Sequence, residues 1–377
     1  MKKILLISNY KPGIGGINAQ VDLLQQFINQ EDGWQADILS TKGNPIRRCI
    51  VFVKLLCKTR KYDILHIHAC SYWGMVPAVF GIIAGKLWRK RTIITYHGGE
   101  AKEYFAKNAS FVRRWLGRAD EVIVLSGFLK EIFEQYQIPC VVIPNIVVLR
   151  PQTEHTTIVA PKFISIRHLE PLYNIPCVLQ AYEQVLKQYP EASLDILGQG
   201  SMRTELEAYV QEHKLTGITF VGQVPNDKIY DYFANATIML SAPKIDNMPV
   251  SLLEAMNAGL LVISSRVGGV PFMIVDGSQA YRHSLKDGAS AYSLEFRGKE
   301  TSEAITQAST PYTLHHTPNK PTGLLFESDN ADELASKMVW ALEHPTEVND
   351  MILNAQKEVQ KYSWENVKEE LFNVYKS

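Results

Sequence analysis

The chain has 377 residues, of which 46% are hydrophobic and 21% are charged, an ordinary composition for a globular protein. A chain of this length is too long for one ordinary hydrophobic core, so we expect two domains. Lysine plus arginine and aspartate plus glutamate both number 39, which gives a formal net charge of zero. A protein that binds nucleic acid over its whole surface would be more basic. The charge balance therefore argues against nucleic acid as a partner and favours anion binding at a local site.

The cysteines and the apolar runs indicate a cytoplasmic protein. The cysteines are odd in number, scattered and without CxxC spacing: Cys49, Cys57, Cys70, Cys140 and Cys177. This pattern predicts reduced thiols rather than a disulfide framework or a zinc site. The apolar run "ILLI" near the start is too short for a signal peptide and predicts a first buried strand. The stretch Ser71–Trp88 contains proline and glycine, so we expect a buried core helix there and not a membrane span.

The first half of the chain alternates short apolar strands with segments of helix length. Strands rich in isoleucine and valine are predicted at residues 3–8, 36–40, 63–68, 91–96, 121–125 and 140–144. Helices are predicted between them, for example at Ala19–Asn29 and Ala101–Leu116. This alternation predicts a parallel sheet with helices on both faces.

The alternation restarts after a polar segment at residues 151–162, which we interpret as a linker. Further strands are predicted at 162–166, 193–197, 218–222, 236–240 and 260–264, and helices near Ile175, Met202 and Pro249. The predicted fold class is α/β, with two doubly wound, Rossmann-like domains at residues 1–150 and 163–345 that face a central cleft. We expect residues of about 278–320 to be a polar insertion in the second domain, and residues 346–377 to form helices that pack back across the domains.

The stretch Lys244–Pro271, "KIDNMPVSLLEAMNAGLLVISSRVGGVP", is the first candidate site. Pro249 is expected in the first turn of a helix, which places Asp246 in the preceding loop and Glu254 in the second turn. A helix N-terminus binds anions, and carboxylates accept hydrogen bonds from hydroxyl groups, so the pattern predicts a nucleotide-sugar site. An equally favoured alternative is that Asp246 only caps the helix and that Glu254 is solvated.

This stretch resembles the E-x7-E region of retaining, family-4-type glycosyltransferases of the GT-B fold, with Asp246 in place of the first glutamate. Other segments resemble that family in the same order along the chain. They are "SNYKPGIGGI" (8–17), "YHGGE" (96–100), "ADEVIVLS" (119–126), "VIPN" (142–145), "ILGQGSMRTELE" (196–207) and "ITFVGQVP" (218–225). The resemblance covers most of the chain outside the expected insertion.

The resemblance implies roles for individual residues. The catalytic residues would be His97, Arg167, Asp246 and Glu254. His97 would hydrogen-bond the transferred sugar or the acceptor, and Arg167 would pair with the diphosphate through its forked donors. The donor-binding residues would be Gly15, Gly16, Gly198, Gly200, Gly222, Gln223, Val224, Asn247, Met248, Pro249, Val250 and Ser251. On sequence alone, a plain turn at "GIGG" and an exposed salt bridge of Arg167 remain open alternatives.

One position departs from the family pattern. The family usually has a lysine about five residues after the arginine, and here Tyr173 or Asn174 stands in its place. Either Arg167 and the helix start suffice to hold the diphosphate, or another cation contributes. Lys244 is the candidate for that second cation.

The function that the resemblance implies is that of a retaining, hexosyltransferase-type enzyme. It would move a sugar from a UDP- or GDP-linked donor to a glycan or lipid-linked acceptor, in cell-surface polysaccharide biosynthesis. The leaving diphosphate would itself accept the acceptor's proton, so no cofactor is expected. No DxD-like motif accompanies a strand end, so no metal requirement is expected either. Two alternatives stay open: a nucleotide-sugar epimerase on the same fold, and a non-catalytic sugar-nucleotide-binding protein.

Three segments of the first half interleave basic and apolar residues: Arg47–Lys61, Lys86–Arg91 and Phe111–Arg118. This composition suits an anionic membrane surface. An ordinary helix with a solvated basic face has the same composition. Composition leaves both open, but the resemblance implies the first, because bacterial relatives often build polysaccharides on lipid carriers; we therefore expect a cytoplasmic protein with peripheral contacts to the inner face of the cell membrane.

Overall fold

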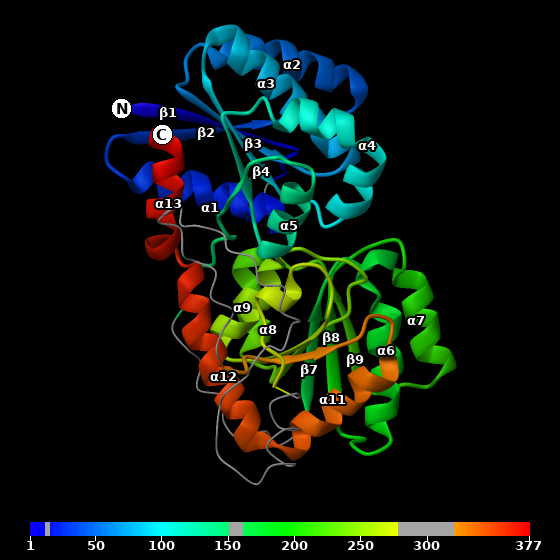
Figure 1. The fold of residues 1–377 in the computed structure, drawn as a ribbon. Helices are drawn as coiled ribbons and strands as arrows, with labels where there is room; N and C mark the ends of the chain where they lie inside the picture. Colours follow the sequence, from blue (N-terminus) through cyan, green and yellow to red (C-terminus); the bar gives the residue numbers. More distant parts are fainter. Residues whose placement is uncertain (12–15, 151–160, 278–319) are drawn as a thin grey trace, which may run out of the picture.

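The computed structural model of the chain describes residues 1–11, 16–150, 161–277 and 320–377. Two α/β domains lie one above the other, and the chain ends on the first of them (Figure 1). Gly15, most of the expected linker (151–160) and nearly all of the expected insertion (278–319) lie outside the described residues.

The first domain is built on a fully parallel sheet with the strand order β2-β1-β3-β4-β5-β6. Its strands are β1 (Lys2–Ser8), β2 (Trp34–Ser40), β3 (Ile64–Ala69), β4 (Arg91–Tyr96), β5 (Glu121–Val124) and β6 (Val141–Val142). Its helices are α1 (Gly16–Gln30), α2 (Pro45–Thr59), the 3-10 helix η1 (Tyr72–Met75), α3 (Val76–Trp88), α4 (Ala101–Leu116) and α5 (Gly127–Gln135). The central strands β1 and β3 are buried along most of their length because both of their faces are covered, and β3 carries two buried histidines, His66 and His68.

The second domain repeats this plan with the strand order β12-β11-β10-β7-β8-β9. Its strands are β7 (Lys162–Ile166), β8 (Ser193–Leu197), β9 (Ile218–Gly222), β10 (Ile238–Ser241), β11 (Leu261–Ser265) and β12 (Leu324–Phe326). Its helices up to β12 are η2 (Pro171–Tyr173), α6 (Ile175–Leu186), α7 (Arg203–Glu212), η3 (Asn226–Lys228), α8 (Ile229–Phe233), α9 (Val250–Ala258) and η4 (Val270–Phe272). After β12 follow α11 (Ala331–Glu343), α12 (Pro345–Val359), η5 (Gln360–Tyr362) and α13 (Trp364–Lys376). The predicted fold class of two doubly wound domains is confirmed.

The strand orders determine where loops converge. In the first sheet the chain moves from β1 to β2 on one side and then to β3 on the other, so the order reverses between β1 and β3. In the second sheet the same reversal lies between β7 and β10. The loops that leave two such strands point apart and open a crevice at the carboxyl edge of the sheet. Arg167 follows β7 and Asp246 lies in the loop after β10, so the topology brings these two residues together.

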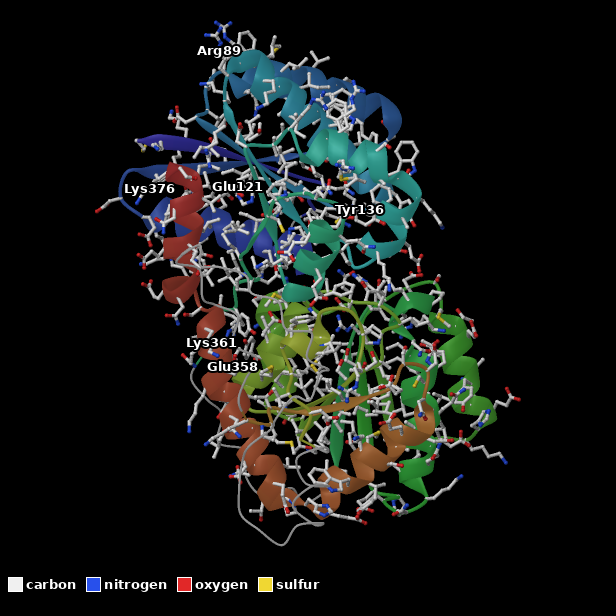
Figure 2. All side chains as sticks on the ribbon, in the orientation of Figure 1. Arg89, Glu121, Tyr136, Glu358, Lys361 and Lys376 are labelled. Atoms are coloured by element: carbon white, nitrogen blue, oxygen red, sulfur yellow. The ribbon has the colours of Figure 1, made fainter. Side chains whose placement is uncertain are left out.

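The last helices connect the two domains. Helix α12 packs against α9 and β11 of the second domain, and α13 packs beside α1 on the sheet of the first (Figure 1). At the turn between them, Glu358 and Lys361 form an ion pair of 2.8 Å and lie next to each other in Figure 2. Trp364 begins α13, stacks on Phe27 with ring centroids 5.2 Å apart, and donates its indole N–H to Glu31 at 2.9 Å.

The docking of α13 provides a stability prediction. Trp364→Ala removes a stacked, buried aromatic ring, so the free energy of unfolding should fall by about 3–5 kcal/mol. Urea denaturation followed by circular dichroism measures this change. Glu369 lies on the exposed side of the same helix, and Glu369→Ala should change stability by less than about 0.5 kcal/mol. Equal effects of the two substitutions would show that α13 does not stabilise the first domain.

Candidate active site

A cleft of about 350 Å³ lies between the two domains. Thirteen residues that the sequence singled out line it: Gly16, His97, Arg167, Gly198, Gln223, Val224, Asp246, Asn247, Met248, Pro249, Val250, Ser251 and Glu254. Gly200 and Gly222 do not line it within the described part of the chain, and Gly15 lies outside that part. The volume is within the range of pockets that hold small ligands and cofactors.

Arg167 is fixed from two directions at the bottom of this cleft. Its Nη1 lies 3.1 Å from Oδ2 of Asp246, and its Nε and Nη2 donate to the hydroxyl of Ser241 at 3.2 and 2.9 Å. The side chains of Arg167 and Asp246 are only 9% and 18% exposed. The expected alternative of an exposed salt bridge is therefore wrong. The pair is largely buried, and the guanidinium has one defined orientation toward the cleft.

The loop between β10 and α9 differs in one detail from the prediction. Pro249 is not in the first helical turn but is the N-cap residue, with a ψ of 115°, and the helix begins at Val250. Asp246 does not cap α9, because its Oδ1 accepts a hydrogen bond from the backbone N–H of its neighbour Asn247 at 2.8 Å. Asp246 is thus free of the helix and engages Arg167. Glu254 lies in the second turn, as expected.

Glu254 is a desolvated carboxyl group. Burial raises its pKa to about 7, an effect that the positive charge of Arg150 partly opposes. Arg150 is held in place by stacking over the ring of Tyr230, 4.2 Å from the ring centroid. Glu254 is half-buried in the cleft wall, which argues against the alternative of a freely solvated side chain. A carboxyl group whose pKa is this strongly raised in a cleft is a candidate for ligand binding.

The position of the missing lysine is occupied by an aromatic side chain. Tyr173 lines the cleft, and its ring centroid is 5.6 Å from the guanidinium carbon of Arg167. Asn174 has a left-handed backbone, with φ of 53°, and donates to Asp329 at 2.8 Å. Lys244, the candidate second cation, does not line the cleft. Its ammonium group instead forms an ion pair with Asp329 at 3.0 Å.

Three residues of the first domain hold the loop that precedes α9. Ser126 caps α5 and donates its hydroxyl to Asn247 at 2.5 Å. Asn145, which follows β6, donates to the carbonyl of Met248 at 2.8 Å. Gly99 lies beside the backbone of Asp246, where an added Cβ would make an ordinary van der Waals contact at 3.6 Å. The two domains therefore meet at this loop, and the first domain helps to define its conformation.

His97 follows β4 and contributes the first domain's imidazole to the cleft. Its Nε2 lies 2.9 Å from Nδ1 of His68. Burial lowers the pKa of His97 to about 4, so the ring is neutral at neutral pH. A neutral imidazole offers one N–H donor and one acceptor, which suits hydroxyl groups better than an anion.

The close packing of two loops explains why position 198 is a glycine. Its φ is 144°, and an added Cβ would lie 1.9 Å from the carbonyl oxygen of Arg167. The missing side chain thus allows the loop after β8 to pack against the loop that carries Arg167. Gly200 has the same role beside Leu169, where an added Cβ would lie 2.2 Å from the carbonyl oxygen.

Sequence reasoning missed several polar residues of the cleft. They are Glu100, Asn145, His168, Gln199 and Asn226. Each lies within or directly beside a segment that the sequence had identified, so proximity to those segments was the available signal. Within the described residues, no group of three or more His, Cys, Asp or Glu side chains is placed to hold a metal ion. In that same part of the chain, no helix is long and apolar enough to cross a membrane.

The two halves of the chain match two family models. "Glycosyltransferase Family 4" matches residues 38–150, and "Glycosyl transferases group 1" matches residues 154–288. The curated relatives include a phosphatidylinositol N-acetylglucosaminyltransferase of Arabidopsis thaliana, 28% identical over 129 residues, which cover 34% of this chain and 28% of that protein. For the first three curated relatives, the match spans only between 19% and 29% of their length. An uncharacterised glycosyltransferase of Methanocaldococcus jannaschii is 20% identical over 301 residues, which cover 73% of this chain and 82% of that protein.

A solved structure shows the same architecture over the whole chain. HepE from Anabaena, crystallised in complex with UDP, matches with a TM-score of 0.73 at 15% identity, covering 100% of both chains. At this identity the similarity establishes the fold. The chain therefore has the GT-B fold, and each of its two halves is similar to a glycosyltransferase family model.

Proposed function

We propose that the protein is a retaining, hexosyltransferase-type enzyme that moves a sugar from a nucleotide-sugar donor to a glycan or lipid-linked acceptor. The observation that carries this proposal is the convergence of three groups at the reversal point of the second sheet. These are the buried guanidinium of Arg167, the start of α9 and the desolvated carboxyl group of Glu254. An arginine and a helix start suit a diphosphate, and a carboxylate suits ribose hydroxyls.

The donor would lie along the cleft with its nucleoside on the second domain. Glu254 would accept hydrogen bonds from the ribose, and Gln223 and Val224 would contact the nucleobase. The diphosphate would lie between Arg167 and the amides at the start of α9. HepE was solved with UDP and with UDP and glucose, which favours a UDP-linked donor over a GDP-linked one.

In the proposed reaction the bond from the sugar to the diphosphate breaks while the acceptor hydroxyl attacks from the same face. The proton of that hydroxyl passes to the leaving diphosphate oxygen. Negative charge grows on the diphosphate during this step, and Arg167 and the α9 amides stabilise it. Asp246 would keep Arg167 oriented before the donor binds and would accept hydrogen bonds from sugar hydroxyls afterwards. This scheme uses no cofactor and no metal ion.

The first domain offers a surface for an acceptor at an anionic membrane. Residues 42–118 contain sixteen lysines and arginines against three aspartates and glutamates, a net charge of +13. Because the whole chain sums to zero, the remainder carries −13. Helices α2 and α3 pack together on this domain, and Arg89 at the end of α3 points outward, away from the second domain (Figure 2). On their surface Ile50, Val53 and Leu87 are 51%, 62% and 61% exposed. We propose that this basic, apolar surface, defined as the exposed side of α2 and α3, contacts anionic lipid at the cytoplasmic face of the cell membrane during surface-polysaccharide synthesis.

A two-step experiment tests the proposed function. Nucleotide sugars are first screened by their effect on the melting temperature, since a ligand of the folded state raises it. The best donor is then incubated with lipid-linked and glycan acceptors, and the release of nucleoside diphosphate is measured. Acceptor-dependent release supports transfer. Conversion of the donor without release would indicate an epimerase, and binding without conversion would indicate a non-catalytic protein.

Glu254 should make donor binding depend on pH. Ribose hydroxyls bind the ionised carboxylate, so donor affinity should be present above pH 7 and be lost as the pH falls through the pKa of about 7. Between pH 8 and pH 6 the Kd should rise by about tenfold. Calorimetry with UDP-glucose or UDP-N-acetylglucosamine measures this, because their bridged diphosphates do not titrate in this range. In Glu254→Gln the affinity should be lower and independent of this titration; a wild-type pH profile in this variant would remove Glu254 from the site.

The raised pKa of Glu254 also makes the stability of the fold depend on pH. Here a rise in pH is unfavourable, whereas for donor binding it is favourable. The folded-state pKa of Glu254 lies above its ordinary value, so its stabilising protonated form is lost as the pH rises through 7. Glu254→Gln should therefore be more stable to unfolding than the wild type at pH 8, by about 3 kcal/mol, and equally stable at pH 4. This readout requires no ligand.

Arg167 should matter more for catalysis than for donor binding. Arg167→Ala should lower kcat at least about a hundredfold, or about 3 kcal/mol, the scale for losing one donor to a developing oxyanion. Lysine at position 167 should restore only part of the activity, because it lacks the planar fork. Lys244→Ala is the matched control, since its ammonium pairs with Asp329 outside the cleft, and it should keep the wild-type kcat. If Arg167→Ala transfers sugar at the wild-type rate, the diphosphate is not held at Arg167.

The basic, apolar surface should bind vesicles in a charge-dependent manner. Co-sedimentation with vesicles containing phosphatidylglycerol should exceed that with phosphatidylcholine alone and should weaken with added salt. Replacing the exposed residues Lys54 and Lys58 of α2, together with Lys61 just after this helix, by glutamate should abolish it. The same charge change at Lys187, Lys228 and Lys357, which are exposed on the second domain and on α12, should leave binding intact. Equal loss in both triple variants would point to net charge rather than to this surface.

A further inference from the structure

Three histidines form a stacked row that ends at the cleft. The rings of His66 and His68 lie 4.8 Å apart between centroids, and those of His68 and His97 lie 5.1 Å apart. His66 and His68 point to the same face of the first sheet, because they are two residues apart on β3. The side chains of His66 and His68 are 1% and 4% exposed. Only His97 reaches the cleft, so the row extends from the domain interior to the candidate site.

The hydrogen bonds of this row leave one buried nitrogen without a partner among the described residues. His66 is satisfied on both sides, by the hydroxyls of Tyr375 and Thr95 at 2.7 Å each. His68 binds His97 through Nδ1, whereas its Nε2 is buried and has no hydrogen-bond partner among the described residues. A buried polar atom without a partner costs free energy comparable to a lost hydrogen bond. The Nε2 of His68 therefore requires an explanation.

A small cavity lies beside this row. Its volume is about 30 Å³, and its wall includes His66, His68, His97, Thr95, Gln20 and Asn145. A cavity of this size holds a water molecule when polar groups line it. The Nε2 of His68 supplies one such partner; the hydroxyl of Thr95 and the amides of Gln20 and Asn145 already bond to His66, Ile146 and Met248, but each oxygen can accept a further hydrogen bond.

The charge state of the three histidine rings determines how many protons their nitrogens carry. Burial lowers the pKa of His66 to about 3 and that of His97 to about 4, and the pKa of His68 lies well below its ordinary value. All three rings are thus neutral at neutral pH, and each carries one proton on one of two nitrogens. In a neutral pair such as His68 and His97, the proton position of one ring determines that of the other.

We propose that His68, together with one water molecule bound in this cavity, is a positioning residue that fixes the tautomer of His97. The Nε2–H form is the more stable tautomer of a free neutral histidine, and both rings can adopt it here at once. His97 then donates from Nε2 to Nδ1 of His68, and His68 donates from Nε2 to the water. His97 consequently presents an unprotonated Nδ1 to the cleft, where it accepts a hydrogen bond from a hydroxyl group. That this hydroxyl belongs to the sugar or the acceptor rests on the proposed function.

Nitrogen NMR of the full-length, ligand-free protein tests the tautomers directly. Histidine-labelled protein should show His97 and His68 as Nε2–H forms, with a cross-peak from the Nε2–H of His68 to water. In His68→Leu the acceptor is lost, so the proton of His97 should move to Nδ1. In His68→Asn the side-chain oxygen replaces Nδ1 as acceptor, and His97 should keep the Nε2–H form. An Nδ1–H form of His97 in the wild type, or an unchanged spectrum of His97 in His68→Leu, would overturn the proposal. A missing cross-peak to water would rule out the bound water molecule.

The control and the kinetic readout separate positioning from general destabilisation. Tyr375→Phe removes a partner of His66 and should leave the tautomer of His97 unchanged. With the donor identified as above, His68→Leu should lower kcat/KM by about tenfold, the scale for one hydrogen bond, and His68→Asn should restore most of it. If no acceptor yields transfer while the tautomers are as expected, the proposed function fails and the positioning role stands. If transfer is observed and His68→Leu has wild-type kinetics, the positioning role fails alone.

Discussion

The direction of the strands is the constraint on which the site depends. Every described strand in both sheets is parallel to its neighbours, so all loops that follow strands emerge at one edge of each sheet. The two edges face each other, and the chain can bring Arg167, Asp246 and His97 together although they are far apart in sequence. The reversal between β7 and β10 then separates two loops enough to admit a ligand. The site follows from topology first and from side-chain chemistry second.

Charge compensation within the second domain prepares the cleft for a ligand. A buried guanidinium is costly without a partner, and Asp246 and Ser241 supply partners for every nitrogen of its fork. Glu254 avoids a similar cost by taking up a proton near neutral pH. The two carboxyl groups are eight residues apart, yet Asp246 pairs with Arg167, whereas burial raises the pKa of Glu254 to about 7. The difference arises from their surroundings, because one lies in a loop beside Arg167 and the other lies on the helix.

The sequence predicted the described strands other than β12, the alternation of two α/β halves and the segments that line the cleft, because periodicity and the order of motifs are local properties. It did not predict that Arg167 and Asp246 bind each other, since that contact depends on the spacing of two loops from different strands. It placed Pro249 one position too far into the helix, because proline suits both the N-cap and the first turn. Lys244 was the candidate second cation for the diphosphate because it is two residues from Asp246 in sequence, but its side chain pairs with Asp329. The histidine row was invisible for a related reason: "HIH" reads as an ordinary strand until β4 places His97 beside it.

The position of α13 has a consequence for synthesis of the chain. The first domain's sheet is complete in sequence by residue 142, but one face of it is covered by the last thirteen-residue helix, Trp364–Lys376. Domains generally fold in order as the ribosome releases them. Helix α1 covers part of this face as soon as the first domain has been made, but the part under α13, which packs with Ile4, Ile64 and Ile93 in one cluster, is completed only after the second domain has been made.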